Sequence, residues 1–155
     1  MFLKRSSYIF AGLIFFVLLI GRFWSSQGMQ WYSELNISPL TPPGWVFGVV
    51  WPVLYGLLIV YAIYIWNMVA DSKLRNGLMA LYGLNIFLNA FWTFLFFYQH
   101  NIAGALVDLI ALWISTFVLI LMTLKVSRFA AALLLPYVLW LSFALYLNYQ
   151  VWILN

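Results

Sequence analysis

Few side chains of this sequence could take part in acid–base or metal chemistry. Asp108 is the only acid inside a long apolar segment, and His100 is the only histidine. The chain has no cysteine, so it offers no thiolate nucleophile and no Cys-based metal site. The sequence also contains no acid pair, no Ser–His–Asp set, no phosphate-binding loop and no zinc-ligand spacing. Neither a metal site nor catalysis by ordinary side chains is predicted.

Asp108 and His100 each allow two interpretations. Asp108 is either a proton- or ligand-gating carboxylate or a hydrogen-bonded clamp to a neighbouring helix or loop. Because no basic residue or second acid lies in the same layer of the chain, we favour the clamp. His100 lies in a short loop, which favours a solvated side chain over an axial ligand of haem.

Aromatic side chains form one face of an apolar segment. Phe47, Trp51 and Tyr55 recur every four residues, so a helix would place them on the same side. Buried aromatic faces offer large, flat contact areas, and pockets for apolar ligands combine them with a few polar groups. This face is therefore predicted to form one wall of a binding pocket.

Amides could supply the polar groups. Asn85 and Asn89 stand four residues apart, and Thr93 continues the same stripe. In a membrane such a stripe either hydrogen-bonds a ligand or holds neighbouring helices together. The sequence leaves both interpretations open.

Prolines surround the aromatic face. Pro39, Pro42 and Pro43 stiffen the chain just before it, and Pro52 lies within it, where it removes a backbone hydrogen bond and bends the helix. A stiff loop above a proline-bent aromatic helix predicts a lidded pocket for a flat apolar ligand. Pro136 is expected to bend a later helix in the same way.

Composition places these residues in a membrane. The chain has 155 residues, of which 67% are hydrophobic and 6% are charged, far from the balance of a water-soluble domain. The net charge of +4 comes from basic residues that stand singly or in pairs. Because they form no basic face, binding of nucleic acid is excluded.

Apolar runs of about 20 residues, the length that spans a bilayer, can be read along the whole chain. We expect an all-α integral membrane protein: a single domain, residues 1–155, that forms a five-transmembrane-helix bundle. A long loop, residues 25–44, containing Trp31 and Tyr32, should follow the first helix. The predicted helices cover about residues 8–24, 45–69, 78–98, 102–124 and 129–152.

Basic residues predict the orientation of the bundle. If five helices alternate, only Arg22 lies on the side of the long loop, and six basic residues share the other side. The positive-inside rule then puts the N-terminus in the cytoplasm and the C-terminus outside. This bias suits a bacterial cell membrane. The six residues are Lys4, Arg5, Lys73, Arg75, Lys125 and Arg128.

Several motifs, in this order across five helices, resemble those of the translocator protein family. The family is also called TspO/MBR, tryptophan-rich sensory proteins or peripheral-type benzodiazepine receptors, and this chain looks like a bacterial member. The resemblance covers nearly the whole chain. Its strongest parts are Trp31-Tyr32, Thr41-Pro42-Pro43-Gly44, Val50–Gly56, Leu84-Asn85, Asn89–Trp92, Ala105–Asp108 and Leu135–Asn148.

The resemblance implies a five-helix bundle, often a homodimer, with one pocket that opens toward the first long loop. It implies a membrane receptor or sensor that takes part in tetrapyrrole handling or stress regulation. The implied ligands are porphyrins (protoporphyrin IX and haem) and benzodiazepine-type or isoquinoline-carboxamide-type molecules, with no obligatory cofactor. One alternative is an enzyme that degrades protoporphyrin in light and oxygen; another is a tetrapyrrole transporter or a partner-binding scaffold.

Carried over position by position, the resemblance also implies pocket residues, with Trp51 and Trp140 as the redox-active pair of an enzyme. The family-implied residues are Tyr32, Pro42, Trp51, Tyr55, Asn89, Trp92, Thr93, Trp140, Phe143, Ala144 and Leu147. The residue patterns add Trp31, Phe47 and Asn85.

One departure from the animal members concerns sterols. The animal members bind cholesterol through a motif in which a tyrosine is followed by a nearby Lys or Arg. Here no basic residue follows Tyr146 or Tyr149. Although such motifs are weak patterns, this absence argues against a dedicated cholesterol site.

Overall fold

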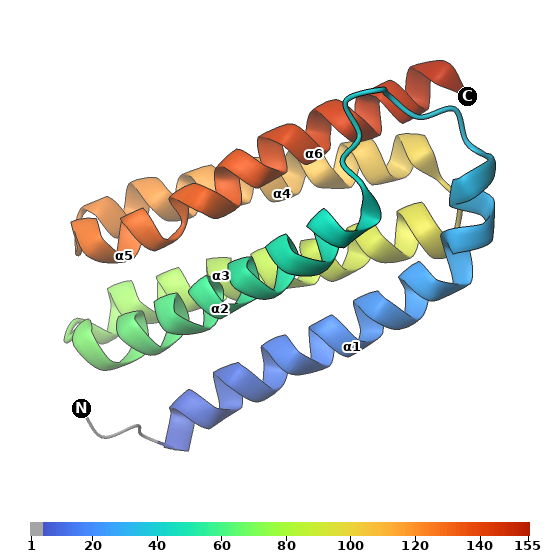
Figure 1. Cartoon of the computed structure of the whole chain (residues 1–155). Helices are drawn as coiled ribbons and strands as arrows, with labels where there is room; N and C mark the ends of the chain where they lie inside the picture. Colours follow the sequence, from blue (N-terminus) through green and yellow to red (C-terminus); the bar gives the residue numbers. More distant parts are fainter. Residues whose placement is uncertain (1–4) are drawn as a thin grey trace.

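The computed structural model describes residues 5–155, with side chains described from Tyr8 onward, and every regular element in that range is helical. Lys4 and the side chain of Arg5, used above for the orientation, lie outside the described part. The helices lie side by side as a bundle (Figure 1). They are α1 (Arg5–Glu34), α2 (Gly44–Met68), α3 (Ser72–Thr93), the π-helix η1 (Phe94–Tyr98), α4 (Ile102–Leu124), α5 (Arg128–Leu133) and α6 (Leu135–Leu154).

The predicted fold class is confirmed. Five helical stretches are long and apolar enough to cross a membrane. The last two of them begin and end close to the predicted boundaries. α3 and η1 together form one such stretch, as do α5 and α6. The stretches are Tyr8–Glu34, Gly44–Met68, Ser72–Tyr98, Ile102–Leu124 and Arg128–Leu154.

The first helix is longer than predicted. It was expected to end near residue 24, but α1 continues to Glu34, and the long loop expected at 25–44 shrinks to residues 35–43. The polar residues after Trp24 do not break the helix, because Ser25 and Ser26 donate their hydroxyls to the carbonyls of Gly21 and Phe23. Their polarity is satisfied within the helix itself.

A close approach explains where the end of α1 lies. A Cβ atom on Gly28 would overlap the backbone carbonyl of Phe97 in η1. Only glycine lets the two backbones pack this closely. The last turns of α1 turn across the end of the bundle beside η1 (Figure 1).

The fifth predicted helix is divided. α5 ends at Leu133, and α6 begins at Leu135, with Pro136 in its first turn. A proline there removes no intrahelical hydrogen bond, because the first N–H groups of a helix have no partner in any case. Pro136 therefore does not bend the interior of a helix as predicted. It lies where a new helix begins.

Side-chain caps fix three of the other helix starts. Asp71 accepts from the N–H groups of Lys73 and Leu74, at 2.8 and 3.2 Å, at the start of α3. Asn101 accepts from the backbone of Gly104 at the start of α4, and Ser127 caps α5. Each cap satisfies backbone donors that the helix leaves free.

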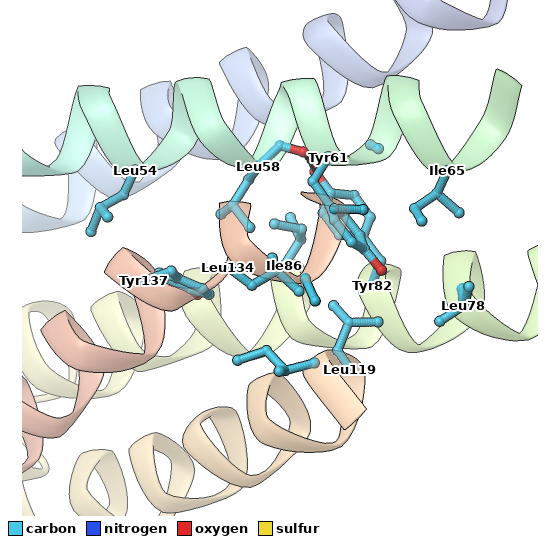
Figure 2. Close-up of a cluster of buried hydrophobic side chains, with 14 of the residues drawn as sticks. Leu54, Leu58, Tyr61, Ile65, Leu78, Tyr82, Ile86, Leu119, Leu134 and Tyr137 are labelled. Carbon is cyan, nitrogen blue, oxygen red and sulfur yellow. Dashed lines mark hydrogen bonds between the residues drawn. The ribbon is translucent and has the colours of Figure 1, made fainter. Parts of the chain in front are cut away.

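The core lies between α2, α3, α4 and the α5–α6 junction (Figure 2). Leu58, Leu78, Leu119 and Leu134 from these elements are almost fully buried. Some buried polar groups are paired across helices: the hydroxyls of Tyr61 and Thr123 lie 2.9 Å apart. Such pairs hold membrane helices together, because lipid offers them no alternative partner.

The connections confirm the predicted alternation of the helices. The α2–α3 and α4–α5 connections, which carry basic residues, lie at the same end of the bundle as the start of α1 (Figure 1). The loop 35–43 and the C-terminus lie at the opposite end. The assignment of the basic end to the cytoplasm stays a prediction.

The close approach at Gly28 gives a first testable prediction. Gly28→Ala should destabilise the protein by about 1–3 kcal/mol, because α1 and η1 must move apart. Thermal unfolding in detergent measures the change. Gly12→Ala is the matched control, since a Cβ atom there meets nothing within 4 Å. If the Gly28 variant unfolds no earlier than the control, the backbone contact does not hold α1 in place.

Candidate functional site

A cavity of about 740 Å³ lies at the loop end of the bundle. Its walls come from α1, α2, the α3–η1 stretch and α6, and the loop 35–43 contributes Pro42 and Pro43. Most predicted pocket residues line this one space. They are Tyr32, Pro42, Phe47, Trp51, Tyr55, Trp92, Thr93, Trp140, Ala144 and Leu147.

Aromatic rings dominate the parts of the wall that come from α2 and α6. On α2, Trp51 stacks against Tyr55 with ring centroids 5.5 Å apart, as the four-residue spacing predicts. Phe47, one turn earlier, meets Trp140 of α6 edge to face at 5.6 Å. Offset and edge-to-face pairs are the favoured arrangements of aromatic rings. The two helices thus present a continuous aromatic surface to the cavity.

Asn89 lies behind this wall rather than in it. It is 2% exposed, and its side-chain oxygen accepts a hydrogen bond from the hydroxyl of Tyr55. Its side-chain N–H group donates to the hydroxyl of Tyr137 at 3.0 Å, and Thr93 donates to its backbone carbonyl. Asn89 therefore corrects the expectation of a lining residue: its side chain fixes the Tyr55 ring that forms the wall.

Asn85 is placed deeper still, away from the cavity. It is fully buried and donates to the hydroxyls of Ser115 and Thr116 of α4, at 2.8 and 2.7 Å. Of its two interpretations, the interhelical one fits the structure. Asn85 does not line the cavity, so the structure does not bring it together with the other predicted pocket residues.

Trp31 and Phe143 also lie outside the cavity lining. Trp31 belongs to α1 rather than to a loop, and its ring stacks on His100 with centroids 4.2 Å apart. Phe143 lines a separate, smaller hollow of about 440 Å³ between α2 and α6. Its ring packs edge to face against Trp140, which does line the cavity, with centroids 5.8 Å apart.

The structure does not confirm the hydrogen-bonded clamp predicted for Asp108. Its side chain is buried, yet within the described part of the chain its Oδ2 atom has no hydrogen-bond partner. It does not line the cavity either. Ser142 of α6 accepts a hydrogen bond from the indole of Trp113 at 2.8 Å.

Sequence reasoning missed the contribution of α1. Gly21, Arg22, Ser25 and Met29 line the cavity together with Tyr32. Their spacing of three and four residues is that of one helix face, but it was hidden because the helix was ended too early. Phe96, Phe97, Asn148 and Val151 also line the cavity, at the ends of the third and fifth stretches.

Asn148 of α6 links three elements by hydrogen bonds of its side chain. Its side-chain oxygen accepts from the indole of Trp92 at 3.0 Å, and its N–H group donates to the carbonyl of Ile102. Both functional groups of the amide are engaged. Asn148 therefore connects α6 to α3 and to α4 at the mouth of the cavity.

The loop above the cavity is fastened to α6. The backbone N–H of Asn36 donates to the side chain of Asn155 at 2.9 Å, and Asn155 donates back to the carbonyl of Asn36 at 3.0 Å. Within the loop, buried Ser38 accepts from the N–H groups of Leu40 and Thr41. The predicted stiff lid is thus held by hydrogen bonds as well as by its prolines.

Comparison with known proteins agrees with this architecture. Residues 9–153 match the model of the TspO/MBR family. The chain belongs to the TspO/MBR family. The resemblance drawn from the motifs is thereby confirmed, and the five-helix bundle is that of a multi-pass membrane protein.

Relatives in this family come from bacteria and animals. Protein CrtK of Rhodobacter capsulatus is 33% identical over 125 residues, covering 81% of this chain and 78% of the relative. Tryptophan-rich protein TspO of Bacillus cereus is 33% identical over 142 residues, 88% of both chains. The translocator protein of Homo sapiens is 33% identical over 117 residues, covering 75% of this chain and 69% of the relative.

The lid contacts of this TspO/MBR protein give a second prediction. Asn155→Ala removes both hydrogen bonds to Asn36 and should speed backbone hydrogen exchange across residues 35–43. Mass spectrometry of the exchanged peptides measures the effect. Asn76→Ala, an exposed asparagine at the opposite end of the bundle, is the matched control. Equal exchange in the two variants would show that Asn155 does not hold the lid.

Proposed function

We propose that the cavity binds a flat, largely apolar ligand of the tetrapyrrole class, such as protoporphyrin IX or haem. In this role the protein is a membrane receptor or sensor in tetrapyrrole handling or stress regulation. The observation that carries the proposal is the cavity itself, which has aromatic walls on α2 and α6 and a hydrogen-bonded lid.

Size and chemistry both support a ligand of this kind. A volume of about 740 Å³ lies within the range of pockets that enclose drug-sized molecules. Trp51, Phe47 and Trp140 offer flat faces and edges to a conjugated ring system. The same walls suit smaller aromatic molecules, so benzodiazepine-type and isoquinoline-carboxamide-type ligands should compete for the same space.

The aromatic wall on α2 gives a third prediction. Protoporphyrin IX titrated into the detergent-solubilised protein should quench tryptophan fluorescence saturably and shift the Soret band. Trp51→Ala should weaken binding about tenfold, because the ligand loses a stacking surface. Trp45→Ala is the matched control: it removes an indole from the same helix, but Trp45 is 70% exposed and does not line the cavity.

Two outcomes would contradict the proposal. Unchanged fluorescence and an unshifted Soret band in the parent protein would exclude porphyrin binding. Equal affinities of the Trp51 and Trp45 variants would place the porphyrin outside this cavity.

A second candidate function is light- and oxygen-dependent degradation of the bound porphyrin. One observation favours it: Trp51 and Trp140, the pair implied for such chemistry, line the same cavity. Phe47, one turn before Trp51 on α2, is in contact with Trp140. Indoles beside a photoexcited porphyrin are placed to exchange electrons with it.

This candidate gives a fourth prediction. Illuminated protoporphyrin IX in air should yield new absorption bands with the parent protein but not with Trp51→Phe or Trp140→Phe. The phenylalanine variants keep an aromatic ring and should still bind porphyrin in the dark. If they degrade the porphyrin as fast as the parent protein, the tryptophans have no redox role.

A further inference from the structure

One charged side chain lines the described part of the largely apolar cavity. Arg22 lies within the stretch Tyr8–Glu34, which is long and apolar enough to cross a membrane, and it lines the same space as Trp51 and Trp140. Among the described residues its guanidinium has no carboxylate within ion-pair distance and no hydrogen-bond acceptor. A charge inside a membrane span is costly unless it faces water, a partner or a ligand.

The helix packing beside Arg22 directs this face of α1 toward the cavity. At the neighbouring Gly21, a Cβ atom would lie 3.9 Å from the hydroxyl of Thr93, so α1 and α3 are in contact there. Ser25 and Met29, on the next turns of the same face, line the cavity too. Arg22 is thus part of the wall and remains exposed rather than covered by neighbouring side chains.

Several other polar side chains of the cavity are already engaged. The hydroxyls of Ser25 and Thr93 donate to backbone carbonyls of their own helices. Tyr55 donates to Asn89, and both groups of Asn148 are bonded. The described wall contains no acidic residue that could neutralise the guanidinium, so an anionic partner would have to come from what enters the cavity.

We propose that Arg22 binds a carboxylate of the ligand, so that the cavity selects flat apolar molecules that carry an acid group. This inference rests on the proposed porphyrin-type ligand and specifies how that ligand is held. A guanidinium offers two parallel N–H donors that match the two oxygens of a carboxylate. With apolar walls around it, this pair is stronger than it would be in water.

The test compares protoporphyrin IX with its dimethyl ester, which has the same ring system but no acid. Affinities for both are measured by tryptophan quenching in one detergent, for the parent protein, Arg22→Gln and Arg22→Lys. The ratio of acid to ester affinity is compared between proteins, because differences in micelle partitioning then cancel. Arg128→Gln is the matched control, since it removes an exposed positive charge far from the cavity.

We expect the parent protein and the Arg128 variant to prefer the acid about tenfold or more, the strength of a charged hydrogen bond. In Arg22→Gln this preference should disappear while the affinity for the ester stays within about twofold. Arg22→Lys should retain part of it, because lysine keeps the charge but not the paired donors. An intact ester affinity also shows that the Arg22→Gln cavity is folded.

Three results would overturn the proposal. An unchanged acid-to-ester ratio in Arg22→Gln would mean that Arg22 serves another group, such as a lipid phosphate. An equal loss of affinity for both molecules would mean that Arg22 only shapes the cavity. A parent protein that binds both molecules without preference would show that no acid is recognised. If the parent protein binds neither molecule, it is the porphyrin function that fails.

Discussion

The cavity depends on one buried amide. Asn89 of α3 accepts from Tyr55 of α2 and donates to Tyr137 of α6, so it joins three helices directly behind the aromatic wall. In the membrane interior no water is available to hydrogen-bond these polar groups, so leaving any of them unpaired would cost free energy. The amide therefore fixes the position of Tyr55, on which Trp51 stacks.

Hydrogen bonds between interior side chains hold the helices together above and below the aromatic walls. Below the cavity, Asn85 and the hydroxyls of α4 close the bundle tightly. At its mouth, Asn148 and Asn155 tie α6 to α3, α4 and the loop. Between these two polar layers Arg22 is the one charged residue of the described wall. This distribution explains how a rigid bundle can keep an open space of about 740 Å³.

Much of the fold and of the aromatic wall could be predicted from the sequence, because a lipid bilayer restricts which structures can cross it. Apolar length gave the helices, and four-residue spacing placed Phe47, Trp51 and Tyr55 on one face. The end of α1 could not be predicted, since serines that bond their own helix look like a loop in sequence. Whether an amide such as Asn85 faces ligand or helix depends on its partners, which spacing alone does not reveal.

The most direct measurement is a structure determined with protoporphyrin IX bound. The macrocycle should lie between the α2 face of Trp51 and Tyr55 and the α6 residue Trp140, under the loop 35–43, with a carboxylate at Arg22. A macrocycle found instead in the hollow lined by Phe143, or on the lipid-facing surface of the bundle, would contradict the binding role of this cavity.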